Sequence, residues 1–298
     1  MSTTASPNDR SLRRAFLLVL IAYLVALAVA WAVAWVLRGH HPLAIVAWAD
    51  LAATLVIFVF SLAFDNSSFY DIYWSVAPVP IVLYLAFHPD AGGDPIRRAL
   101  LVLLVTAWGV RLTWNWIRTW QGLQHEDWRY IDLRHKTGAA YWLVSFTGLH
   151  LFPTLIVLLA CVPLYPASTL RLTSFNALDL LATLVTGGAI ALEALADQTL
   201  YEFRRQSPPA GAILDRGPWR WSRHPNYLGE MGFWWGLALF GLAARAPVLT
   251  TIAGAASITA MFVFITIPMI ERRMLARRPA YAERIRRVSM VVPWPPKP

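Results

Sequence analysis

Long apolar runs dominate the chain and recur along most of its length. The first, Ala15 to Leu37, contains no charged residue, and the second, Leu43 to Phe64, contains only Asp50. A helix needs about 20 apolar residues to cross the hydrocarbon core of a bilayer. The pattern therefore predicts an all-α, polytopic transmembrane helix bundle of about eight helices, at residues 15–37, 43–64, 73–88, 99–118, 140–163, 175–196, 227–244 and 247–270.

Composition and charge support this fold class and set the orientation. Only 14% of the 298 residues are charged, against roughly 25% in soluble domains. With the N-terminus placed inside, 20 Lys and Arg residues fall in cytoplasmic segments, five fall in outer loops, and Arg111 lies within a helix. Because cytoplasmic loops are enriched in Lys and Arg, we predict that both termini are cytoplasmic. Topology and contact with anionic membrane lipids then explain the net charge of +9, and no nucleic acid partner is needed.

The fourth predicted helix carries polar residues at membrane depth. Arg111 and Asn115 are four residues apart and therefore share a face, and Arg118 follows on the same side. A charged side chain at this depth is costly and usually faces the interior of a bundle. We expect Arg111 and Asn115 to line a polar cavity, whereas Arg118 is also explained as an interfacial anchor.

The segment after this helix mixes acids, bases and aromatic residues. It reads QGLQHEDWRYIDLR over residues 121–134. A solvated loop does not need Trp128 and Tyr130 between its charges, so Arg129 and Tyr130 are candidate ligand-binding residues. An interfacial aromatic belt would explain the same pattern.

The sixth predicted helix ends in two carboxylates. Glu193 and Asp197 are four residues apart on one face and should repel each other. A positive group is therefore expected to face them, and Arg204 follows within two turns. A salt-bridge set at the end of a helix is the alternative explanation.

The most specific segment is GPWRWSRHPNYLGE, residues 217–230. Proline biases the preceding His224 toward an extended conformation, which places Asn226 near the start of the seventh helix, where backbone N–H groups favour an anion. Glu230 lies on the same face as Asn226, and Arg223 adds donors that match phosphate. This combination predicts a nucleotide-type ligand site, with a structural helix cap as the alternative.

The last segment, from Glu271 to Trp294, is strongly basic and helical in pattern, which is typical of a membrane-surface helix. Common motifs are absent from the chain: it contains no G-x-G-x-x-G, no G-x-x-x-x-G-K-[ST], no H-E-x-x-H and no C-x-x-C. The histidines are scattered, and we predict no metal site.

Taken together, the motifs resemble a known family. WSRHPNYLGE at 221–230, ADQ at 196–198, EDWRY at 126–130 and ERRMLARRPAYAERIRRVSMVVPWPP at 271–296 are similar to the bacterial branch of the steroid 5-alpha-reductase superfamily. The resemblance runs from about residue 60 to the end of the chain. It implies one membrane domain over 1–298, with N-terminal helices at 1–64 and a reductase-like core at 65–298 whose cofactor-binding loops are cytoplasmic. The expected location is the bacterial inner membrane.

The resemblance also implies a cofactor and a reaction. Members of the superfamily bind NADPH without a Rossmann domain and transfer hydride to a carbon–carbon double bond conjugated to a carbonyl. Their asparagine and glutamate match Asn226 and Glu230, and their aspartate and arginine match Asp197 and Arg204, whereas Glu193 replaces a family asparagine. Residue patterns and resemblance together nominate as cofactor-binding residues Arg111, Asn115, Arg129, Tyr130, Asp197, Arg204, Arg223, His224, Asn226, Tyr227 and Glu230.

The catalytic pair of the steroid-reducing members is not retained in kind. Those members polarise the substrate carbonyl with a glutamate and a tyrosine, which by a rough register fall near residues 71–72 and near Trp108. We therefore expect Asp71 and Tyr73 to act jointly as the donors, and the substrate to be a lipophilic enone. Both residues could instead be interfacial residues at a helix start.

Two other functions fit parts of the sequence. The R-H-P-x-Y-x-G pattern is shared with membrane methyltransferases that act on isoprenylcysteine or phospholipids and bind S-adenosylmethionine. Arginines at 204–223 and 272–278 favour NADPH, because its 2′-phosphate requires cations. A transporter or lipid-binding protein would need a polar path across the bilayer, whereas the polar groups are predicted to lie near one face.

Overall fold

The computed structural model describes residues 7–89, 91–171, 173–209 and 211–297, and this part of the chain contains helices and loops but no strand. The predicted all-α, polytopic fold is confirmed. The chain forms two compact units, which are described separately: unit 1 contains residues 1–85 and 105–159, and unit 2 contains residues 86–104 and 160–298. The predicted single domain, with N-terminal helices at 1–64, stays a prediction.

Seven helical runs within the described residues are long and apolar enough to cross a membrane, so the protein is an integral membrane protein in contact with lipid. They are Ser11–Val36, Pro42–Ala63, Ser67–Ala86, Pro95–Thr119, Trp128–Thr169, Ala177–Arg205 and Val248–Arg277. The seventh predicted helix, residues 227–244, is present as helix α11 (Pro225–Ala243). It is not among the seven, because Asn226, Glu230 and several amphipathic aromatic residues lower its hydropathy.

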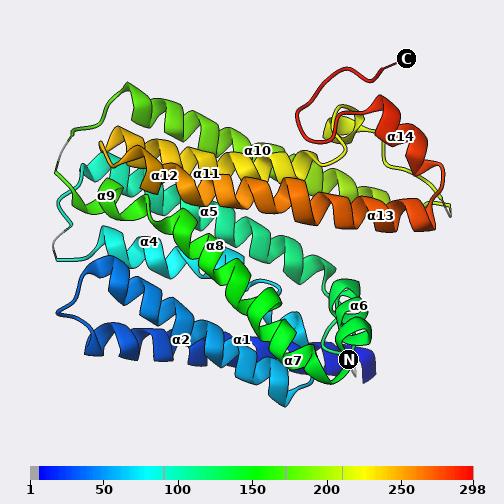
Figure 1. Ribbon diagram of the computed structural model, residues 1–298, viewed down its shortest axis with the longest axis horizontal. Helices are drawn as coiled ribbons and strands as arrows, with labels where there is room; N and C mark the ends of the chain where they lie inside the picture. Colours follow the sequence, from blue (N-terminus) through cyan, green and yellow to red (C-terminus); the bar gives the residue numbers. More distant parts are fainter. Residues whose placement is uncertain (1–6, 90, 172, 210, 298) are drawn as a thin grey trace, which may run out of the picture. The chain divides into compact units, whose positions relative to one another are not determined.

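Unit 1 is built on two long antiparallel helices that lie side by side (Figure 1). Its core is aromatic: Phe69, Tyr70 and Tyr73 are buried, and Tyr23 and Trp116 pack against them. Its elements are α1 (Pro7–Val36), α2 (Pro42–Ala63), η1 (Ser67–Tyr70), α3 (Tyr73–Val76), α4 (Pro78–Ala86), the second half of α5 (Pro95–Thr119), α6 (Trp128–Thr137), η2 (Gly138–Ala140), α7 (Tyr141–Val144), η3 (Ser145–Leu151) and most of α8 (Phe152–Cys161).

Unit 2 is built on α10, α11, α12 and α13, which run beside one another in Figure 1. Glycines allow α10 and α11 to approach closely: a Cβ at Gly229 would lie 2.6 Å from the Glu193 Cβ, and one at Gly236 would lie 2.1 Å from the Thr186 hydroxyl. Small residues commonly bring membrane helices together in this way. Its elements after α5 are α9 (Leu164–Thr169), α10 (Ala177–Arg205), η4 (Gly217–Arg220), α11, α12 (Val248–Met261), η5 (Phe262–Thr266), α13 (Ile267–Arg277) and α14 (Tyr281–Arg287).

Two π-helical turns interrupt the long spans, and each lies just before a proline. The turn η3 ends two residues before Pro153, and η5 ends two residues before Pro268. Proline lacks an N–H group and crowds the carbonyl four residues earlier, so the preceding turn widens. Consistent with this, the N–H groups of Phe152 and Ile267 donate to carbonyls five residues back.

Three predicted elements differ from the structure. The third predicted helix, residues 73–88, is divided at Ala77 into α3 and α4, and it is preceded by η1, which the Asn66 side chain caps at the Ser68 N–H. The segment at 128–137 is the helix α6, capped by Asp127. The sixth helix does not end near residue 196 but continues to Arg205.

Candidate functional site

The extension of α10 gathers charged residues at its C-terminal end. Asp197 and Arg204 are seven residues apart on one continuous helix and therefore share a face. The charge on Arg204 lies within electrostatic reach of Asp197, Tyr227 and Arg278. The predicted positive group near the paired carboxylates is thus present, and Arg278 is an additional cation there.

The start of α11 carries the asparagine and the glutamate of the predicted ligand site. Pro225 opens the helix, and His224 before it lies outside the helical region with φ −138°, although its ψ of 60° falls short of the extended conformation that was predicted. Asn226 Oδ1 is buried and has no hydrogen-bond partner among the described residues. Glu230 is 2% exposed and accepts a hydrogen bond of 2.7 Å from the Trp234 indole. Buried polar atoms normally have a partner, so the Asn226 oxygen fits a ligand that donates to it.

Arg223 and His224 have protein partners rather than an open position. The Arg223 guanidinium donates to Glu271 at 2.6 Å and to the carbonyls of Ile285 and Val288 at 2.9 and 2.7 Å. His224 Nε2 lies 3.0 Å from the same Glu271 oxygen. Four of the five guanidinium N–H groups are therefore used within the protein. These residues, which were predicted to bind cofactor, fasten the C-terminal segment to the start of α11, and the pattern analysis did not single out Glu271.

We call the cluster of Arg223, His224 and Glu271 the brace, and further contacts surround it. The Tyr281 ring is buried, and burial together with the nearby Glu271 charge raises the pKa of its hydroxyl to about 12. Tyr227 stacks on His224 with ring centroids 5.5 Å apart and also contacts Phe262. Because these ring contacts hold Tyr227 in one position, we expect a pre-formed binding surface around it.

The remaining predicted cofactor-binding residues lie in unit 1. Arg129 forms a bidentate pair with Asp127, the residue that caps α6. The Tyr130 hydroxyl donates to Asp71 at 2.8 Å. Asp71 and Tyr130 are therefore paired with each other, and the charge of Arg129 lies within electrostatic reach of Asp71.

On α5, the two residues predicted to share a polar cavity are differently engaged. Asn115 Oδ1 accepts hydrogen bonds from Arg118 at 3.0 and 2.7 Å, which is a contact along one helix. Arg111 is partly buried one turn earlier. The structure thus assigns Asn115 a partner toward the helix end.

The structure pairs Tyr73 with an acid that the residue patterns did not nominate. The Tyr73 hydroxyl donates to Asp50 Oδ1 at 2.7 Å and lies 2.9 Å from the Asp50 carbonyl. Asp50 and Tyr73 are 6% and 5% exposed. Asp71 is instead bonded to Tyr130, so Asp71 and Tyr73 do not form the expected joint donor pair. Asp50 is the lone charge in an apolar helix, and such a residue is a functional candidate by default.

A buried polar network surrounds the Asp50–Tyr73 pair. Tyr70 stacks on Tyr73 at 5.2 Å, and its hydroxyl lies 2.8 Å from Thr154, which in turn lies 3.0 Å from Thr54. Each of these groups is buried and has a hydrogen-bond partner. The network therefore fixes the position of the Tyr73 ring.

Fold and site together define a class: an all-helical integral membrane protein with one polar cluster at the end of α10 and a buried acid–tyrosine pair on two apolar helical runs of unit 1. The chain belongs to the DUF1295 family, described as a protein of unknown function, which it matches over residues 57–288. That family is steroid 5-alpha-reductase-like.

One curated relative is an uncharacterized protein of Schizosaccharomyces pombe, 30% identical over 208 residues. The aligned part is 62% of this chain and 60% of the relative, so the chain spans less than two thirds of the relative's length. No solved structure matches.

Proposed function

We propose that this protein is an NADPH-dependent reductase of the bacterial inner membrane. Its substrate would be a lipophilic compound with a carbon–carbon double bond conjugated to a carbonyl. The observation that carries the proposal is the buried Asp50–Tyr73 pair, joined by a hydrogen bond of 2.7 Å within predicted membrane spans. An acid and a tyrosine are the groups with which the steroid-reducing members of the resembled superfamily polarise a carbonyl.

The residues at the C-terminal end of α10 fit the cofactor. Arg204 and Arg278 are suited to phosphate groups, and the start of α11 presents backbone N–H groups to an anion. Asn226 Oδ1 is a buried acceptor without a described partner and suits a hydroxyl or amide donor of the cofactor. When bound, NADPH supplies the hydride. Arg223, His224 and Glu271 keep the surface in place without contacting the ligand.

Asp50 and Tyr73 act on the substrate carbonyl. Because the Tyr73 O–H group is directed at Asp50, a protonated Asp50 retains one O–H group for the substrate oxygen. Negative charge develops on that oxygen as the β carbon is reduced, and a donor that is already in place stabilises it. The buried aromatic side chains of Phe69 and Tyr70 keep water away from the pair and strengthen this interaction.

The test is NADPH oxidation by the purified protein with a panel of lipophilic enones. We expect Asp50→Asn and Tyr73→Phe to lower kcat by about 100-fold or more, as for loss of one oxyanion donor, while NADPH affinity stays unchanged. Asp71→Asn and Tyr130→Phe are matched controls, since they alter a second buried acid–tyrosine pair in the same unit. Equal losses in both pairs, or full turnover in the Asp50 and Tyr73 variants, would remove the first pair from the mechanism.

A further inference from the structure

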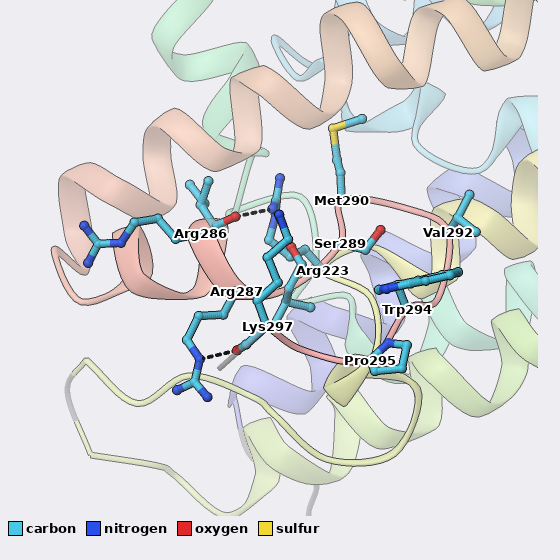
Figure 2. A pocket seen from close by; sticks show the side chains of 11 residues that line it. Arg223, Arg286, Arg287, Ser289, Met290, Val292, Trp294, Pro295 and Lys297 are labelled. Atoms are coloured by element: carbon cyan, nitrogen blue, oxygen red, sulfur yellow. Dashed lines mark hydrogen bonds between the residues drawn. The ribbon is translucent and has the colours of Figure 1, made fainter.

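A pocket lies within the C-terminal segment of unit 2, apart from the residues proposed to hold the cofactor. Its volume is about 430 Å³. Figure 2 shows the chain after α14 curving around it, with side chains gathered along that curve. The lining residues are Arg223, Ile285, Arg286, Arg287, Val288, Ser289, Met290, Val292, Trp294, Pro295 and Lys297.

Hydrogen bonds hold the curved segment in place at several points. The Arg223 N–H donates to the Ser289 carbonyl at 2.9 Å, and the Trp294 N–H donates to the Trp221 carbonyl at 3.1 Å. At its far end, Lys297 N–H donates to the Arg287 carbonyl, and Arg287 Nε donates to the Lys297 carbonyl, both at 2.9 Å. The pocket is therefore formed by a fastened loop and does not depend on a ligand to shape it.

The charge of the pocket is positive. Four of the lining residues are Arg or Lys, and none is Asp or Glu. The charge of Arg223 is compensated by Glu271, and Arg286 pairs with Glu283. Among the described residues, no carboxylate pairs with Arg287 or Lys297 in a salt bridge. Glu283 also lies within electrostatic reach of Arg287, but with Glu271 and Glu283 both counted, the described residues around the pocket keep a net positive charge that attracts an anion.

The rim of the pocket is apolar and exposed, which points to a membrane surface. Val292 and Trp294 are 64% and 67% exposed. Trp side chains are favoured at the headgroup level of a bilayer, where one part of the ring contacts apolar groups. The last membrane span ends at Arg277, eight residues before the first lining residue of the α14 segment, Ile285. Cations beside exposed apolar groups, close to the end of a span, match a phospholipid better than a soluble anion.

We propose that this pocket binds the phosphate headgroup of an anionic phospholipid. Arg287 and Lys297 would contact the phosphate, and Trp294 and Val292 would contact the glycerol backbone and the first carbons of the acyl chains. The binding would anchor the C-terminal segment, which Arg223 also joins to the start of α11. The inference goes beyond the proposed reductase function, because it concerns a lipid and not the cofactor or the substrate.

The experiment uses the full chain in phosphatidylcholine nanodiscs, with phosphatidylglycerol titrated in and bound lipid counted by native mass spectrometry. We expect Lys297→Gln to weaken phosphatidylglycerol binding about fivefold, and the double variant Arg287→Gln/Lys297→Gln about 25-fold, given the contribution of each cation near an anionic surface. Lys297→Gln leaves the backbone bond to Arg287 intact, so it tests charge without loosening the loop. Arg14→Gln is the matched control, an exposed arginine at the start of another span.

Two competition experiments distinguish a lipid phosphate from inorganic phosphate and from the phosphates of NADPH. Inorganic phosphate at millimolar concentration should not displace the lipid, and neither should saturating NADPH. Displacement by inorganic phosphate would make this a general phosphate site, and displacement by NADPH would make it part of the cofactor site; either result overturns the proposal. An equal loss in Arg14→Gln would do the same, because it would show unspecific attraction.

Discussion

The two ends of helix α10 use charged residues in opposite ways. At the N-terminal end, Asn176 and Asp179 form a capping box, and Asp179 also accepts hydrogen bonds from Arg97 at 2.6 and 2.8 Å. Both side chains of this ion pair are 0% exposed, and Arg97 donates further to Thr173 and Ser174. The polar groups at this end are therefore all hydrogen-bonded within the protein.

At the C-terminal end, a buried polar atom has no hydrogen-bond partner among the described residues. Asp197 and Arg204 lie at the charged end of α10, and Asn226 keeps a buried oxygen without a described partner. The structural salt bridge at this end is formed by neighbouring residues, Arg223 and Glu271. A fully paired charge cluster stabilises a helix junction, whereas a buried acceptor without a described partner, such as Asn226 Oδ1, can receive a ligand. The predictions below test that distinction.

The largest effect is expected from breaking the buried pair at the N-terminal end. Arg97→Ala leaves Asp179 buried and uncompensated, which costs about 3–5 kcal/mol. We expect the Tm of the detergent-solubilised protein to fall by on the order of 10 °C, measured by intrinsic tryptophan fluorescence. The double variant Arg97→Met/Asp179→Leu should recover much of the loss, since it removes both charges. A double variant as unstable as the single one would contradict this explanation.

A smaller effect is expected from the brace at the other end. Glu271→Gln removes the charge that Arg223 and His224 share, at a cost of about 1.5–3 kcal/mol for hydrogen bonds to a charged group. Trypsin should then release the C-terminal segment faster by cleavage after Arg277, because Pro279 blocks cleavage after Arg278. Glu283→Gln is the control. Glu283 pairs with the exposed Arg286 within α14, so the loss of this pair should leave cleavage unchanged. Equal cleavage in both variants would show that the brace does not hold the segment.

The third prediction separates ligand binding from stability. Asn226→Ala removes a side chain whose oxygen has no described partner, so the Tm should stay within the error of the measurement. NADPH affinity should fall about tenfold, the cost of one good hydrogen bond, as measured by isothermal titration calorimetry. NADH should bind more weakly than NADPH to the unmodified protein. Binding of S-adenosylmethionine in place of NADPH would identify a methyltransferase instead.

The smallest effect is a pH dependence at the fully paired end. Burial would raise the pKa of Asp94, but backbone N–H groups of Arg97, Phe175 and Ile96 outweigh it and lower that pKa. An aspartate with a lowered pKa adds stability above its unfolded value of about 3.9, and the gain is lost as pH falls through the folded value. We expect Asp94→Asn to flatten the decline of Tm between about pH 5 and pH 2.5. An unchanged decline would assign the acid sensitivity to other carboxylates.

The membrane helices followed from the sequence because hydrophobicity is a local property. An apolar run such as Leu43–Phe64 must be buried in protein or face lipid along its whole length, whatever it packs against. Its helix could therefore be predicted from the sequence. The start of α11 at Pro225 followed in the same way, because proline restricts the residue before it. The orientation inferred from Lys and Arg also rests on local charge, and it stays a prediction.

The partners of the polar residues were decided by tertiary structure. Periodicity places a residue on a face of its own helix but does not say which helix meets that face. Tyr73 therefore could not be matched with Asp50, 23 positions earlier, and was joined instead to the nearby Asp71. Arg223 and Glu271 are 48 positions apart, and Arg97 and Asp179 are 82 apart. Such pairs depend on the register between packed helices, which close approaches such as that of Gly229 to Glu193 set, and a single sequence does not encode that register in any local pattern.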